Sequence, residues 1–96
     1  MAQTNTIGRV ATKIIRDNET TKVRYHWTDV VTFTKDKIIL DSGRYHTQTT
    51  KTRMNQTANQ FDLGFNVYQE NFEWFVVVNR DFDNPIKFYD GMVLER

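Results

Sequence analysis

The chain has 96 residues, a net charge of +1, 14% aromatic residues and no cysteine. This length provides one hydrophobic core, so we expect a single domain over residues 1–96, with a flexible N-terminus at residues 1–6. The lack of cysteine excludes disulfides, thiolate metal sites and cysteine nucleophiles.

No apolar run approaches the roughly 20 residues that span a bilayer, and the opening MAQTNT lacks the pattern of a signal peptide. We therefore expect no membrane partner. Residues 1–56 contain ten Lys or Arg against five Asp or Glu, whereas residues 57–96 contain three against seven. This division predicts a basic face and an acidic face, unless strand pairing cancels it.

The first half of the chain is typical of strands. Residues 7–17 fit either a strand or a helix, and their β-branched content favours the strand. After a turn at residues 18–20, residues 22–34 predict strands with a bend at Thr28-Asp29. Alternation puts these apolar side chains on one parity, which indicates one buried face: Val23, Tyr25, Trp27, Val31 and Phe33.

A polar turn at Lys35-Asp36 leads to a return strand at residues 37–41. Ser42-Gly43 predicts another turn. Residues 44–48 then predict a short strand that leads into the helix.

One helix is predicted, within the stretch YHTQTTKTRMNQTANQF at residues 45–61. Its apolar positions, Met54, Ala58 and Phe61, follow the i, i+4, i+7 spacing of one narrow buried face. We expect them to pack against Trp27, Trp74 and Val76. Thr49 or Thr50 is the expected N-cap, and the opposite face offers polar side chains to solvent or to a partner: Lys51, Arg53, Gln56, Asn59 and Gln60.

The second half predicts a hairpin and a short closing strand. Gly64 is expected to end the helix in a left-handed conformation. Residues 65–69 and 72–79 form the hairpin, followed by a charged loop at 80–84, a strand entry at 85–89, a turn at Asp90-Gly91 and a last strand at 92–94. The predicted fold class is α+β: an antiparallel β-sheet, meander plus hairpin, with one amphipathic helix packed on it.

A short motif occurs twice in the chain, as Arg24-Tyr25-His26-Trp27-Thr28 and as Arg44-Tyr45-His46-Thr47. If the two segments paired, His26 and His46 could act as the base and acid of a small metal-independent ribonuclease. Two half-exposed sheet histidines are the simpler interpretation. The histidines lack metal-ligand spacing, there is no phosphate-binding Gly-rich loop, and the single serine, Ser42, lies in no nucleophile elbow. We expect no enzyme, no metal and no cofactor.

The aromatic residues leave two interpretations open. On an open sheet face beside Arg24, Arg44 or Arg53 they would stack nucleic-acid bases. Inside, they would supply the core that a small domain needs. The sequence favours the core without deciding the matter for these residues: Tyr25, Trp27, Tyr45, Tyr68 and Trp74.

Two motifs carry a family resemblance. They are His26-Trp27-Thr28-Asp29-Val30-Val31 and Thr49-Thr50-Lys51-Thr52-Arg53-Met54-Asn55. With Phe88-Tyr89-Asp90-Gly91-Met92 downstream, the chain resembles a group of short bacteriophage and mobile-element proteins over roughly residues 24–94. The resemblance implies a viral origin and the host-cell cytoplasm, and it implies no function or site residue.

The leading hypothesis is a non-enzymatic phage accessory protein that binds a host or phage protein, in an inhibitor or anti-defence type of role. A single-stranded nucleic-acid-binding module is the alternative, and the two-histidine ribonuclease is a weaker one. The predicted contact patch lies where the helix begins, in a stretch without acidic residues: Arg44, His46, Gln48, Lys51, Arg53 and Gln56. Arg53 is the expected anchor, unless it pairs internally with an acid such as Glu73.

Overall fold

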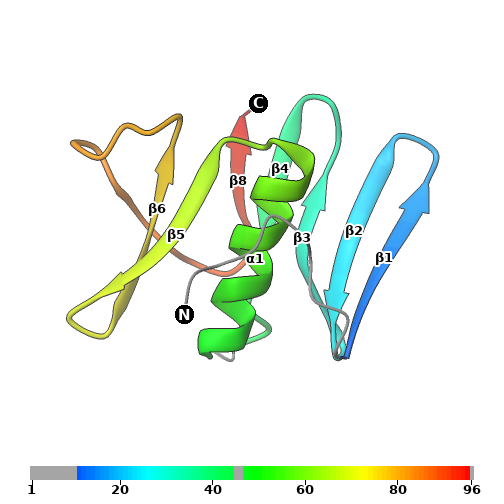
Figure 1. Ribbon diagram of the computed structural model, residues 1–96, viewed down its shortest axis with the longest axis horizontal. Coiled ribbons are helices and arrows are strands. Elements are labelled where there is room, and N and C mark those ends of the chain that lie inside the picture. The colour runs from blue at the N-terminus through cyan, green and yellow to red at the C-terminus, as the bar shows by residue number, and fades with distance from the viewer. Residues whose placement is uncertain (1–10, 45–46, 96) are drawn as a thin grey trace.

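The computed structural model describes residues 11–44 and 47–95. In these residues one helix accompanies two antiparallel sheets (Figure 1). The elements in chain order are β1 (Thr12–Asp17), β2 (Thr20–Tyr25), β3 (Thr28–Phe33), β4 (Lys37–Leu40), α1 (Gln48–Phe61), β5 (Phe65–Glu70), β6 (Glu73–Val78), β7 (Ile86–Lys87) and β8 (Met92–Glu95). The predicted α+β class, with one helix packed on antiparallel strands, is confirmed.

The strands divide between a five-stranded sheet, in the order β1-β2-β3-β4-β8, and a three-stranded sheet, β5-β6-β7. The expectation of one sheet is therefore wrong. The last strand returns to pair with β4, with Leu40 opposite Met92 and Lys37 opposite Glu95. In Figure 1, α1 crosses in front of the larger sheet and runs beside β5.

The expected bend at Thr28-Asp29 is instead a hairpin turn at His26-Trp27, because Tyr25 pairs with Thr28 across it. His26 has a φ of +56°. Turn residues leave the pleat of the strand, so alternation no longer places their side chains, and Trp27 is 96% exposed. The prediction that Trp27 packs in the core is wrong.

The N-cap of the helix lies two or three residues earlier than the expected Thr49 or Thr50. Thr47 is the N-cap, and its hydroxyl oxygen accepts a hydrogen bond of 3.1 Å from the backbone N–H of Thr50. The predicted strand at residues 44–48 is not present in its described part, because Arg44 lies in a turn and Gln48 opens α1. At the other end, Asp62 provides the left-handed cap at φ +55°, and Gly64 follows with φ +76°.

The core joins both sheets to the helix. Met54 and Ala58 are 0% and 4% exposed, and Trp74 and Val76 belong to the same cluster. Phe61 is half-buried against this cluster, and its ring centroid lies 4.9 Å from that of Phe33. The apolar stripe of the helix is thus confirmed, apart from its predicted contact with Trp27.

Polar residues of α1 are buried as well, because the helix contacts β2 and β3 of one sheet and β5 of the other. Asn55 lies against β5, an edge strand of its sheet. Its side-chain oxygen accepts a 2.7 Å hydrogen bond from the Val67 N–H, and its side-chain nitrogen donates a 2.8 Å bond to the Val67 carbonyl. Asn55 therefore takes the place of a neighbouring strand.

The other aromatic residues have mixed environments. Trp74 is 3% exposed, in agreement with a core role. Tyr25 and Tyr68 are half-buried, and the Tyr68 ring stacks on Phe75 with centroids 5.6 Å apart. The expectations that concern residues 1–10, Tyr45 and His46 lie outside the described residues.

The half-burial of Phe61 sets the effect of its removal. Truncation of a fully buried phenylalanine costs about 3–5 kcal/mol, and we expect Phe61→Ala to cost about 2 kcal/mol because part of the ring is already in water. Urea unfolding measures this change. A loss under about 0.5 kcal/mol, typical of surface sites, would contradict the packing of Phe61 on Phe33.

A candidate binding surface at the start of the helix

The structure separates the six residues of the predicted contact patch. Arg44 and Gln48 are exposed, and His46 lies outside the described residues. The remaining three are buried, with exposed fractions of 9% for Lys51, 9% for Arg53 and 7% for Gln56. The expectation that these three side chains face solvent is wrong, and among the described residues of the patch only Arg44 and Gln48 remain open at the surface.

Arg53 makes internal contacts. Its Nε donates a 3.0 Å hydrogen bond to the Thr12 hydroxyl, and its terminal nitrogen donates a 3.1 Å bond to the Gln56 side chain. The guanidinium carbon also lies 5.8 Å from the centroid of the Tyr25 ring, which is a cation–π distance. These contacts tie the helix to β1 and β2, so Arg53 fits a structural role better than the predicted anchor.

Glu73, the carboxylate named as a possible partner of Arg53, does not pair with it. In the described residues no ion pair joins Arg53 to Glu73, which instead lies 3.7 Å from the Lys87 ammonium. The Lys51 nitrogen lies 6.0 Å from the centroid of the Trp74 ring. A glutamate at either position would bury a carboxylate, which is costly without a partner.

The loop between β4 and α1 is fixed by Asp90, which precedes β8. The Asp90 carboxylate accepts hydrogen bonds from the Ser42 N–H at 2.9 Å, the Ser42 hydroxyl at 2.6 Å and the Arg44 N–H at 3.1 Å. Gly43 has a φ of +64° and packs so closely on Thr28 that a Cβ atom would overlap the Thr28 hydroxyl. Arg44 is therefore held close to the β2–β3 turn.

This turn carries the main surface feature that sequence analysis missed. An open cavity of about 420 Å³ lies between the turn and the N-cap of α1, lined by Tyr25, His26, Trp27, Thr28, Val30, Ser42 and Thr47. The turn and the start of α1 lie at the same, lower end of Figure 1. The sequence marked the β2–β3 turn only weakly, because His-Trp is not among the Asn-Gly or Asp-Gly pairs that are typical of two-residue turns.

We call four exposed residues at this end of the molecule the hairpin-tip surface: His26 and Trp27, which line the cavity, and Arg44 and Gln48, which lie close in sequence to its lining residues Ser42 and Thr47. It offers an indole ring, a cationic guanidinium, an amide and an imidazole. The first turn of α1 adds N–H groups and a partial positive charge, and α1 has no acidic residue in that turn. These groups suit contact with a polar, partly acidic protein surface.

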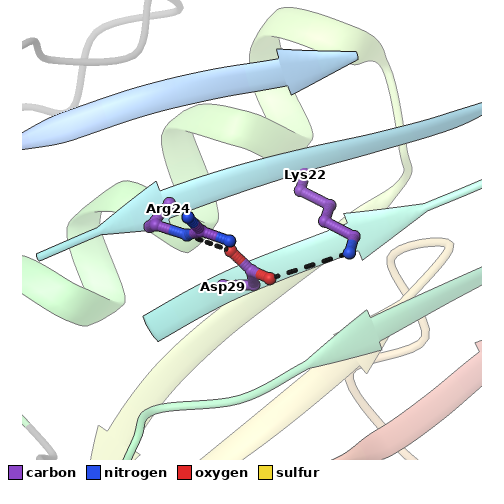
Figure 2. A network of polar contacts seen from close by, with 3 residues as sticks. All are labelled: Lys22, Arg24 and Asp29. Atoms are coloured by element: carbon purple, nitrogen blue, oxygen red, sulfur yellow. Dashed lines mark hydrogen bonds and ion pairs between the residues drawn. The ribbon is translucent and has the colours of Figure 1, made fainter. Parts of the chain in front are cut away.

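The face of the larger sheet that points away from α1 carries a small ionic network (Figure 2). The Arg24 Nε lies 2.8 Å from one Asp29 oxygen, and the Lys22 nitrogen lies 4.0 Å from the other. The hydrogen bond from Arg24 to Asp29, and then the charge of that carboxylate, raise the pKa of the Arg24 guanidinium. Arginine is already charged at every physiological pH, so the raised pKa of Arg24 adds no pH dependence.

Comparison with family models matches residues 1–95 to the Kyanoviridae Gp96 protein family. The chain belongs to this family. The match confirms the phage origin that the resemblance implied. No curated protein and no solved structure matches the Gp96-family chain.

Three further findings concern the histidines, metal ligands and helices of the described part of this Gp96-family chain. His26 lies at the exposed turn, while His46 lies outside the described residues, so their pairing stays a prediction. No three His, Asp or Glu side chains come together as metal ligands within residues 11–44 and 47–95. Over the same residues, the one helix, α1, is not long and apolar enough to cross a membrane.

Proposed function

We propose that this Gp96-family protein acts in the host cytoplasm by binding a host or phage protein, without catalysis, through the hairpin-tip surface. The observation that carries the proposal is the exposure of Trp27. Monomeric proteins bury most of their large aromatic area, so a tryptophan that is 96% exposed at a fixed turn has an unused binding capacity.

The magnitude of this capacity is large. A tryptophan side chain of about 200 Å², buried at about 25 cal/mol per Å², contributes on the order of 5 kcal/mol before ordering costs. Tryptophan and arginine are also enriched among the residues that dominate protein interfaces. Trp27 lies at the rim of a cavity whose walls are already formed, which lowers the entropy that binding has to overcome.

The charges favour an acidic contact on the partner. Arg44 is exposed beside the N-terminal end of α1, where unpaired N–H groups add positive potential. A carboxylate of the partner would therefore lie next to the indole anchor. An inhibitor or anti-defence role is compatible with a contact of this kind and is the expected biological context.

Trp27→Ala tests the proposal in affinity capture from lysates of uninfected and infected host cells, with and without nuclease. We expect the recovery of the captured protein to fall at least tenfold, about 1.4 kcal/mol, because truncation of an interface tryptophan removes a dominant contact. The melting temperature should be unchanged, since the exposed ring stabilises little in the free protein.

Phe72→Ala is the matched control. Phe72 is 94% exposed at the β5–β6 turn and has the same lack of burial as Trp27, but it does not line the hairpin-tip cavity. An equal loss of recovered protein for the two variants would contradict the proposed binding role of the hairpin-tip surface. Recovery that disappears after nuclease treatment would favour the alternative single-stranded nucleic-acid-binding module.

A further inference from the structure

We propose a second binding site at the other end of α1: a pocket that takes the side chain of an arginine presented by a protein partner. It is an open cavity of about 570 Å³ between the end of the helix, β5, β6 and the loop after β6. Its rim carries Asn59, Asp62, Asn66, Asn79, Arg80 and Phe82, all of them exposed. The end of α1 lies at the top of Figure 1, away from the hairpin-tip surface.

The rim is fixed by its backbone. Asp62, Asn79 and Arg80 have φ values of +55°, +54° and +60°, and Gly64 has +76°. The Asn79 N–H donates a 2.7 Å hydrogen bond to the Gly64 carbonyl, which joins the two turns that bound the cavity. Polar groups held on such turns are oriented before a ligand arrives.

The electrostatics favour a cationic group. The last turn of a helix leaves carbonyl oxygens without intrahelical donors and carries a partial negative charge, and α1 has no basic residue in its last turn. Asp62 adds a carboxylate at the same place, and no described residue forms an ion pair with it. The three asparagine side chains supply further acceptor oxygens.

The shape favours a guanidinium over an ammonium. Phe82 is 64% exposed at the rim, and its ring can stack on a planar cation while Asp62 accepts hydrogen bonds from the edge of that cation. The floor is apolar, formed by Ala58, Phe65 and Val77, which suits the methylene stem of arginine. The same chain already places guanidinium groups 5.6 and 5.8 Å from the rings of Phe61 and Tyr25.

Two neighbouring features set the specificity. Asp81 and Asp83 follow in the same loop outside the pocket, and they add a weaker, solvent-screened repulsion of a phosphate or carboxylate ligand to that of Asp62. Arg80 opposes the proposed ligand by its like charge and weakens binding. A variant without the Arg80 charge should therefore bind the cation more tightly.

This inference does not depend on the proposed function, because the pocket shares no residue with the hairpin-tip surface. It adds a partner segment of basic character to the contact proposed above. It also gives a role to the acidic second half of the chain, where residues 57–96 carry seven Asp or Glu against three Lys or Arg.

The test titrates the isotope-labelled full chain with N-acetyl-arginine amide and follows backbone amide shifts by NMR. For a ligand of this size we expect a dissociation constant on the order of 1 mM, with shifts at Asn59, Asp62 and Asn79. N-acetyl-citrulline amide has nearly the same shape without the charge and should bind at least tenfold more weakly. Equal binding of the two compounds, or no shifts at these residues, would overturn the proposal.

Asp62→Asn and Asp83→Asn form a matched pair, since each removes one negative charge and only Asp62 lines the pocket. Asparagine tolerates the left-handed backbone of position 62, so the fold is kept. We expect Asp62→Asn to weaken arginine binding at least tenfold and Asp83→Asn less than about twofold, because an exposed charge outside the pocket is screened. Arg80→Asn should strengthen binding. Equal weakening by the two aspartate variants would mean long-range attraction without a pocket and would refute the site.

Discussion

Replacing Asn55 by alanine should lower the free energy of unfolding by about 3–5 kcal/mol, because it leaves two buried backbone groups without partners, at about 1–3 kcal/mol each, and opens a small cavity. Asn55 is 4% exposed and bonds both the N–H and the carbonyl of Val67. The mechanism is specific: the side chain satisfies the free edge of β5, which pairs on its other side with β6.

Asn59→Ala provides the control, because Asn59 is an exposed amide one turn further along the same helix. It should cost less than about 0.5 kcal/mol, as most surface substitutions do. Urea unfolding of both variants measures the difference. If Asn55→Ala also costs under about 1 kcal/mol, water reaches the backbone N–H and carbonyl of Val67, and α1 does not pack on β5 as described.

The second large effect is expected at Gly43. Gly43→Ala should cost about 3 kcal/mol, made up of roughly 1–2 kcal/mol for a left-handed non-glycine residue and the remainder for contact with Thr28. The new Cβ would overlap the Thr28 hydroxyl oxygen and lie 3.1 Å from two carbon atoms of that side chain. Because Gly43 holds the loop that presents Arg44, the variant should also weaken partner capture.

A Thr28→Ala background separates the two contributions. It removes the hydroxyl and the methyl group that meet the new Cβ and leaves only the Cβ of residue 28, at 3.1 Å, so Gly43→Ala should then cost little more than the backbone share of about 1–2 kcal/mol. Denaturant unfolding of the two single variants and the double variant measures the free energies of this double-mutant cycle. An identical loss in both backgrounds would show that Thr28 does not limit the space at Gly43.

Local patterns in the sequence predicted most of the elements. The stripe of Met54 and Ala58 marked the buried side of the helix, and polar pairs such as Lys35-Asp36 marked the turns between strands. These features depend on residues close in sequence, where side-chain period and turn chemistry are informative. The boundaries were less accurate, since Thr47 rather than Thr49 or Thr50 caps the helix.

The candidate sites were predicted poorly, for a physical reason visible at Arg53. A polar side chain on the far side of an amphipathic helix is normally solvated, and the sequence gives no sign that strands of two sheets will approach α1 from different sides. Thr12, which lies 41 positions before Arg53, supplies its hydrogen bond. Trp27 shows the converse, because its alternation with Val23 predicted burial until the chain turned at His26-Trp27.

By itself the sequence determined the phage-like motifs, the absence of cysteine chemistry, the strand-rich α+β class and the position of one helix. Only the tertiary structure decided that β8 pairs with β4, that Asn55 replaces a strand beside Val67, and that Trp27 is exposed. Composition and period are local properties that each segment carries alone. Burial and pairing depend on which distant segments meet, and that is set by the packing of the whole chain.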